Sequence, residues 1–126
     1  MTDRIPLLID TDPGVDDALA LLMAFDDAAH DVVGLTVAAG NVGLRHTVAN
    51  ALKLCEVAGR GDVPVFAGCD APLLHAAPDA AYVHGQDGFG DVGAVERDEN
   101  RLVHSDSWRS AILQNRAILE NRATGT

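Results

Sequence analysis

Three short apolar runs, separated by segments with helical periodicity, constrain the fold of this chain more than any other feature. The runs cover residues 5–9, 32–37 and 63–67, and polar, glycine-containing turns follow the first two. Nearly continuous apolar runs of this length are typical of strands buried in a parallel sheet. In the segments between the runs, apolar residues recur every three or four positions, which predicts helices. The sequence therefore predicts a βαβαβ unit with right-handed connections.

The two expected helices follow the first and second runs. One helical face carries Val15, Ala18, Leu19, Leu22 and Met23, and we expect this first helix to run to about residue 29. The second helix is expected from residue 44, with Gly59 as its C-terminal cap. Such a unit is the first part of a doubly wound, mainly parallel α/β sheet.

Composition divides the chain into two parts. Residues 1–93 hold 14 acidic and 4 basic residues and 11 of the 12 glycines, whereas residues 94–126 hold 5 acidic and 5 basic residues. We therefore predict a glycine-rich α/β region over 1–93 and a divergent, partly helical tail over 94–126, with a helix near 107–121. Residues 68–93 show no clear period and predict a long loop, and loops of that length are usually functional or mobile.

The net charge of −10 restricts the partners of the protein. So acidic a chain lacks the basic patches that bind nucleic acid or anionic membranes. No apolar run approaches the roughly 18 to 20 residues of a membrane span, and the start of the chain lacks the features of a signal peptide. Cys55 and Cys69 are isolated, without the close pairs of a zinc or redox motif. We therefore expect a cytoplasmic protein with free thiols.

Four carboxylates lie within eight residues at the end of the first predicted strand: Asp10, Asp12, Asp16 and Asp17. In open α/β sheets, ligands bind at the carboxyl ends of the strands. Two like charges 4 Å apart cost on the order of 4 kcal/mol at an effective dielectric near 20. A hard divalent cation with oxygen ligands, Ca²⁺ or Mg²⁺, would offset that repulsion. The alternative is that these residues are helix caps, which explains one or two of them.

Two further polar features stand out, and the first of them is expected near the same edge of the sheet. Asn41 follows the second strand, where an asparagine is also common as a turn residue with a left-handed backbone. The glycine-rich segment from His84 to Gly90 is either a simple turn or part of a functional loop.

These segments together resemble one protein family. Residues 8–18, which read LIDTDPGVDDA, resemble the N-terminal signature of the inosine/uridine-preferring nucleoside hydrolases. The GNV segment at 40–42 and the HGQDG segment at 84–88 resemble the next two motifs of that family, in the same order. The resemblance extends over residues 5 to about 93. It implies a calcium-dependent enzyme of purine and pyrimidine salvage that hydrolyses the N-glycosidic bond of ribonucleosides to ribose and free base.

The resemblance also implies roles for individual residues. Asp12 would be a calcium ligand and the base that takes a proton from the attacking water. Asp17 would bind calcium through both carboxylate oxygens, and Asp10 would support the metal site. The substrate contacts would come from three residues: Asp16 and Asn41 on the ribose, and His84 near the base. These roles agree with the chemistry of water activation and of glycosidic cleavage.

The family's chains are much longer than 126 residues, so we expect a truncated or frameshifted product with activity near background. A ribonucleoside is the expected partner, and a homo-oligomer is left open. Two alternatives remain at this point. One is a non-catalytic fragment that binds Ca²⁺ or associates with another chain. The other is a Mg²⁺-dependent phosphatase of the haloacid dehalogenase type. Against this alternative, the only lysine of the chain, Lys53, lies in the middle of a predicted helix and not in the context of a phosphate-binding lysine.

Overall fold

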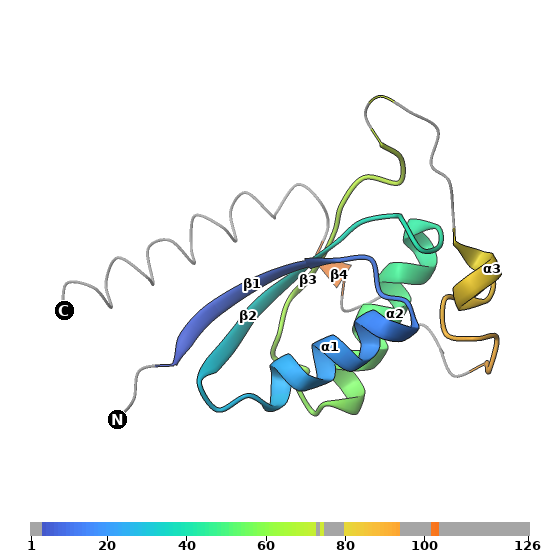
Figure 1. Ribbon diagram of the computed structural model, residues 1–126. Helices are drawn as coiled ribbons and strands as arrows, with labels where there is room; N and C mark the ends of the chain where they lie inside the picture. Colours follow the sequence, from blue (N-terminus) through green and yellow to red (C-terminus); the bar gives the residue numbers. More distant parts are fainter. Residues whose placement is uncertain (1–3, 73, 75–79, 94–101, 104–126) are drawn as a thin grey trace.

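The computed structural model describes residues 4–72, 74, 80–93 and 102–103 (Figure 1). Within these residues, four strands form one parallel sheet in the order β1-β2-β3-β4. The elements follow one another along the chain as β1 (Ile5–Thr11), α1 (Val15–Asp26), β2 (His30–Val37), α2 (Leu44–Val57), β3 (Val65–Ala67), α3 (Ala81–His84) and β4 (Leu102–Val103). The prediction of an α/β fold with parallel strands in a βαβαβ order is confirmed.

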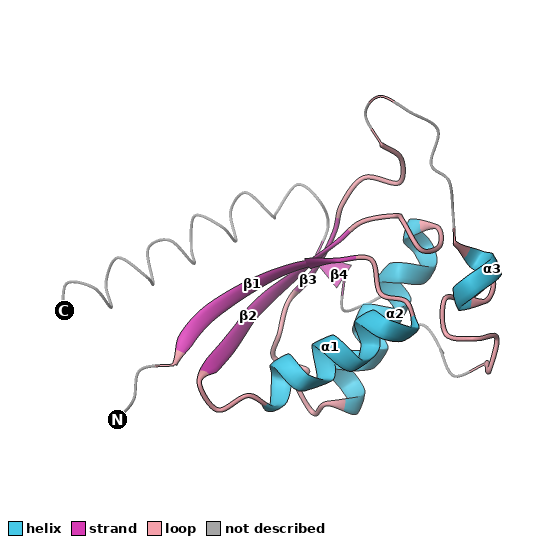
Figure 2. Cartoon of the chain, in the orientation of Figure 1, coloured by secondary structure: helices cyan, strands magenta, loops and turns pink. Residues whose placement is uncertain are grey.

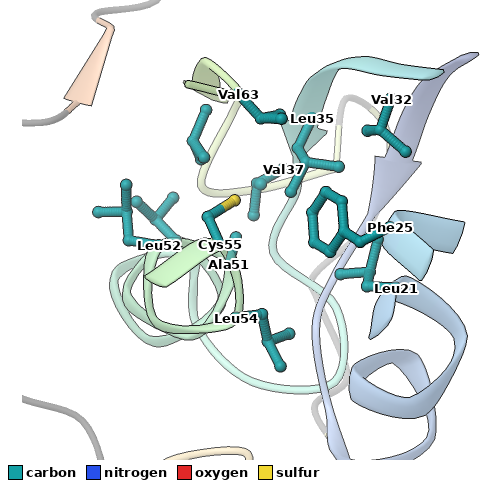
Figure 3. Packing of buried hydrophobic residues seen from close by; sticks show 12 residues of the cluster. Leu21, Phe25, Val32, Leu35, Val37, Ala51, Leu52, Leu54, Cys55 and Val63 are labelled. Atoms are coloured by element: carbon teal, nitrogen blue, oxygen red, sulfur yellow. The ribbon is translucent and has the colours of Figure 1, made fainter. Parts of the chain in front are cut away.

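Helices α1 and α2 lie on the same side of the sheet and bury a shared apolar core against it (Figure 2). Leu21 and Phe25 of α1 and Leu54 of α2 lie in one cluster with Val32 and Leu35 of β2 (Figure 3). Full burial of such a side chain stabilises the fold by roughly 1.5–3 kcal/mol. The core therefore fixes the position of both helices relative to the carboxyl ends of β1 and β2.

The register of β1 and β2 brings the turns after these strands together. Asp10 pairs with Thr36 and Thr11 pairs with Val37, so both strands end at the same level. The Ala38 N–H donates to the Thr11 carbonyl oxygen at 3.1 Å, one residue beyond the last strand pair. The turn at 12–14 and the turn at 38–43 therefore leave the sheet side by side.

Some predicted boundaries are wrong by a few residues. Strand β1 continues through Thr11, so Asp10 lies in the strand rather than in the turn. Helix α1 ends at Asp26 instead of residue 29. The Asp27 carboxylate accepts a hydrogen bond from the Ala29 N–H at 2.9 Å and lies 2.6 Å from His30 Nδ1. These local bonds hold the chain in a turn, which leads directly into β2.

The predicted cap of the second helix is confirmed. Helix α2 ends at Val57, and Gly59 has the left-handed φ of +66°. The Gly59 N–H donates to the Glu56 carbonyl oxygen at 3.0 Å, and the Arg60 N–H donates to the Cys55 carbonyl oxygen at 2.8 Å. This pair of bonds satisfies carbonyl groups that the helix leaves free at its end.

The region after β3 contains more structure than the sequence indicated. The described part of the predicted loop holds the short helix α3 and a hydrogen-bonded turn over 85–91. Leu102 and Val103 of the predicted tail form β4, which pairs with Val65 and Phe66. The helix expected near 107–121 lies outside the described residues, and the boundary at residue 93 stays a prediction. No helix in the described ranges is long and apolar enough to cross a membrane.

Candidate active site

Asn41 connects the two aspartates expected to be most important for function. Its side-chain Nδ2 donates to the Asp17 Oδ2 at 2.9 Å and to the Asp12 carbonyl oxygen at 2.9 Å. Its backbone N–H donates to the Asp12 Oδ2 at 2.8 Å. The structure therefore brings together Asp12, Asp17 and Asn41 at the carboxyl ends of β1 and β2. The alternative interpretation of Asn41 as a left-handed turn residue is wrong, because Asp91 is the only non-glycine residue with positive φ in the described part of the chain.

Asp17 also caps the helix on which it lies. Its Oδ2 accepts a hydrogen bond from the Gly14 N–H at 3.1 Å, and its Oδ1 accepts one from the Thr11 hydroxyl at 3.3 Å. A carboxylate in the first turn of a helix is stabilised by the helix dipole by about 0.3–1 kcal/mol. The cap interpretation thus holds for Asp17. Asp16 differs, because 83% of its side chain is exposed.

Asp10 lies apart from this cluster. Its Oδ1 accepts a hydrogen bond from the Thr36 hydroxyl at 2.8 Å across the β1–β2 pair. Among the described residues, no hydrogen bond joins Asp10 to Asp12, Asp17 or Asn41. Its expected role in supporting a metal site stays a prediction.

His84 reaches the start of α1 from the segment that follows the long loop. Its Nδ1 accepts a hydrogen bond from the Val15 N–H at 3.2 Å, and the same atom lies 3.8 Å from the Asp16 Oδ1. A neutral imidazole that accepts at Nδ1 carries its proton at Nε2. The Ala80 N–H also donates to the Asn41 carbonyl oxygen at 2.8 Å. The predicted proximity of His84 to the aspartate-rich turn is therefore observed, although 69 residues separate His84 from Val15.

Two glycines allow these groups to approach so closely. A Cβ atom at Gly14 would lie 2.7 Å from His84 Nδ1 and 2.9 Å from Asn41 Nδ2. A Cβ atom at Gly40 would overlap the Asp12 carboxylate. Any larger residue at either position would have to displace the site residues that it meets.

Asn50 was not singled out by the sequence, yet it links two parts of the site. This α2 residue is 1% exposed, and its Nδ2 donates to the Pro13 carbonyl oxygen at 3.0 Å and to the Asp87 carbonyl oxygen at 2.9 Å. The signal available in the sequence is an asparagine directly beside the apolar face of a predicted helix. Buried polar side chains are nearly always hydrogen-bonded, so such a position predicts a specific partner.

Asp87 and Asp91 hold the turn that follows His84. The Asp87 carboxylate accepts from the N–H groups of Phe89 at 2.7 Å and Asp91 at 2.9 Å. Asp91 in return accepts from the N–H groups of Gln86 at 2.6 Å and Asp87 at 3.1 Å. Burial acts to raise the pKa of Asp87, but these backbone hydrogen bonds outweigh it and the pKa is lowered. The turn is therefore a compact unit held by hydrogen bonds from backbone N–H groups to the Asp87 and Asp91 carboxyl groups.

The cluster offers the kind of ligand atoms that a hard cation prefers, but too few of them. In the described part of the chain, no ion pair involves Asp12 or Asp17. Their partners are neutral donors, which leaves two negative charges close together. However, no group of three or more His, Cys, Asp or Glu side chains in the described ranges is arranged to hold a metal ion. Asp12 and Asp17 therefore offer part of an oxygen ligand set.

The fold and the cluster together define a parallel α/β protein with a carboxylate-rich site at the strand ends. The sequence pattern of the family described as inosine-uridine preferring nucleoside hydrolase matches residues 7–124, so the match continues past residue 93, where the resemblance was expected to end. The chain belongs to this family.

Individual relatives agree with that assignment. Uridine nucleosidase 1 of Arabidopsis thaliana is 51% identical over 87 residues, which cover 68% of this chain and 26% of the relative. The inosine-uridine preferring nucleoside hydrolase of Crithidia fasciculata is 34% identical over 96 residues, covering 76% of this chain and 30% of the relative. The chain thus spans about a quarter to a third of the length of these curated relatives.

Solved structures give the same result. A plant nucleoside hydrolase superposes with a TM-score of 0.70 at 38% identity, over 76% of this chain and 31% of that structure. The match confirms the predicted family and the α/β fold. Nothing in these comparisons favours the phosphatase alternative.

Proposed function

We propose that this chain carries the water-activating and ribose-binding part of a calcium-dependent ribonucleoside hydrolase. The reaction is cleavage of the N-glycosidic bond by water to give ribose and the free base. Family membership supports this reaction class. The observation that carries the assignment to particular residues is the Asn41 side chain, which joins the Asp12 backbone to the Asp17 carboxylate.

Asp12 and Asp17 are the residues that would hold calcium. Their carboxylate oxygens are the hard ligands that Ca²⁺ prefers, and Ca²⁺ takes about six to eight of them, so other oxygens complete the set. When bound, a divalent cation makes water easier to deprotonate.

Asp12 is proposed as the general base. The Asn41 N–H holds its Oδ2 at 2.8 Å, which fixes the orientation of the carboxylate. Among the described residues, no donor occupies its Oδ1, so this oxygen can accept a proton from the attacking water. The proton passes from the water to Asp12 as the water oxygen bonds to the anomeric carbon. The electron pair of the broken C–N bond leaves with the nucleobase. Nearby carboxylates stabilise the oxocarbenium-like transition state.

The ribose contacts are assigned to Asp16 and Asn41. Asp16 presents an exposed carboxylate beside the cluster, which suits hydrogen bonds from sugar hydroxyls. Binding both hydroxyls would orient the ribose for attack and disfavour 2′-deoxyribonucleosides. His84 lies next to Asp16 and is assigned a position near the nucleobase of the substrate.

A second candidate function is association with another chain, including a second copy. The exposed face of α1 carries three apolar side chains that are 49–73% exposed: Val15, Leu19 and Met23. An apolar stripe of this kind is common at protein interfaces. A cytoplasmic location is also part of the proposal, on the basis of the isolated cysteines.

A chimera tests the proposed function directly. Residues 7–93 of this chain would replace the matching segment of the Arabidopsis uridine nucleosidase 1. We expect calcium-dependent release of base from uridine and inosine, and scarcely any from the 2′-deoxyribonucleosides. A folded chimera that hydrolyses neither nucleoside, or that hydrolyses both sugar types equally, would contradict the assignment. For the 126-residue chain alone, we expect turnover near background, because the residues that the structure describes offer only part of a calcium ligand set.

A further inference from the structure

Three attachments hold the segment that carries His84 against the aspartate-rich turn. The Ala80 N–H donates to the Asn41 carbonyl oxygen, and the His84 ring accepts from the Val15 N–H. The third attachment is Asn50, whose amide group donates to both Pro13 and Asp87. The first two attachments are made by Ala80 and His84, whereas Asn50 holds the turn that follows them, at Asp87.

Asn50 lies between two backbone carbonyl groups that belong to different parts of the site. Pro13 directly follows the proposed base, Asp12, and Asp87 lies three residues after His84. One Nδ2 atom supplies both hydrogen bonds, at 3.0 and 2.9 Å, from a side chain that is 1% exposed. The bond to Pro13 is buried and the bond to Asp87 is partly buried, and their loss would leave two carbonyl oxygens without this donor.

The turn over 85–91 is held together by hydrogen bonds among its own residues. The reciprocal hydrogen bonds between Asp87 and Asp91 hold it internally. Gly88 lies directly against the amide of Asn50, since a Cβ atom there would come within 2.7 Å of Asn50 Nδ2. Loss of the Asn50 bonds would thus leave the turn held to the site only through the Ala80 and His84 hydrogen bonds, which would weaken these two attachments rather than unfold the core.

We infer that Asn50 is a positioning residue that sets the distance between the Asp12 turn and the His84 segment. The inference rests on the proposed function, because it assigns to Asn50 the placement of two groups used in the same reaction. Asn50 acts through Pro13 and Asp87 and does not itself contact the aspartate cluster. Through its bond to Asp87, Asn50 holds the segment so that His84 lies close to Asp16.

Amide hydrogen exchange in the full 126-residue chain tests this inference. The readout is the exchange rate of the Val15 and Ala80 amides, which donate the two remaining bonds between the segment and the site, relative to that of amides in β2. In Asn50→Ala we expect this ratio to rise about tenfold or more, as both hydrogen bonds of the Asn50 amide group are lost. Leu54→Ala is the control, because Leu54 lies in the core on the same helix, and its truncation destabilises the fold without removing a hydrogen bond to the turn. Equal ratios in the two variants would overturn the inference.

A glycine pair tests the contact from the other side and does not require a change in α2. Gly88 and Gly90 both have positive φ, at +82° and +72°, so alanine introduces similar backbone strain at each. Only the Cβ at position 88 would press on Asn50, since nothing lies within 4 Å of a Cβ at position 90. We expect Gly88→Ala to raise the exchange ratio of the Val15 and Ala80 amides well above its value in Gly90→Ala. Similar ratios would count against the role of Asn50.

The nitrogen resonances of the His84 ring supply a readout that a purely structural role would not move. In the parent we expect the tautomer with its proton at Nε2, because Nδ1 accepts from Val15. In Asn50→Ala we expect a mixture of tautomers, and in Leu54→Ala the parent spectrum. An unchanged His84 spectrum in Asn50→Ala would refute the positioning role. Neither readout needs turnover, so failure of hydrolysis would refute the proposed function alone.

Discussion

Asn41 Nδ2 lies 2.9 Å from Asp17 Oδ2, although the two residues are 24 positions apart and follow different strands. This single contact joins the turn after β2 to the first turn of α1. The parallel register of β1 and β2 makes it possible, because both strands end at the same level. The site is therefore a direct product of the sheet topology, and the predictions below test that relationship.

Removal of the Asn41 side chain should destabilise the fold. Asn41→Ala deletes the hydrogen bonds to Asp17 and to the Asp12 carbonyl oxygen, so we expect unfolding free energy to fall by about 1–3 kcal/mol. Urea denaturation measures the change. Thr36→Val is the control, since it removes only the more exposed bond to Asp10, and we expect a loss below about 1 kcal/mol. Equal losses of unfolding free energy in the two variants would show that the Asn41 bonds stabilise the fold no more than the exposed Thr36 bond does.

Calcium should stabilise the folded chain through Asp17. A thermal melt in millimolar CaCl₂ should show a higher Tm, because a ligand that binds only the folded state shifts the equilibrium toward it. We expect the shift to disappear in Asp17→Asn and to remain in Asp26→Asn, which alters an exposed residue at the other end of α1. A parent protein whose Tm does not respond to calcium would refute the metal assignment.

The close approach of Gly40 to Asp12 predicts a position-specific effect of alanine. In Gly40→Ala the new methyl group would overlap the Asp12 carboxylate, so we expect a loss of about 1–3 kcal/mol and no calcium response. Gly43→Ala is a matched control three residues away, where nothing lies within 4 Å of the added atom. Denaturation and the calcium melt of both variants give the comparison. A Gly40→Ala protein that keeps the calcium response would show that Asp12 is not needed for it.

Asp87 predicts part of the stability loss in acid. Its pKa is lowered in the folded chain, because the N–H groups of Phe89 and Asp91 outweigh the effect of burial. The ionised form therefore stabilises the fold fully above the ordinary value of 3.8, and this contribution is lost as pH falls through the lowered value. We expect unfolding free energy to fall more steeply below about pH 4 in the parent than in Asp87→Asn. Parallel pH profiles would contradict this assignment.

The sequence predicts most of the first 67 residues because hydrophobic periodicity is a local signal. Buried strands and amphipathic helices leave that pattern directly in the chain, as Leu35 and Leu52 illustrate. The end of α1 was misplaced because the Asp27 side chain stops the helix through its own hydrogen bonds, which periodicity does not register.

The sequence indicated several of the residues that the structure brings together, but neither Asn50 nor the hydrogen bonds that connect them. The proximity of Asp12 and Asn41 follows from strand order, since neighbouring parallel strands end at the same edge. The contact of His84 with Val15 depends on the path of a segment without periodicity, and only the motif resemblance indicated it. The role of Asn50 depends on two backbone carbonyl groups 37 residues away on either side, which no local pattern reveals.

Turnover of the chimera with Asp12→Asn tests the central claim most directly. The claim is that Asp12 accepts the proton of the attacking water, with Asn41 holding its Oδ2. Steady-state release of uracil from uridine, in the presence of calcium, should fall by at least about a hundredfold in the variant, as expected for loss of a general base. Asp26→Asn in the same chimera should keep the parent rate. A folded Asp12→Asn chimera with near-parent turnover would contradict the account.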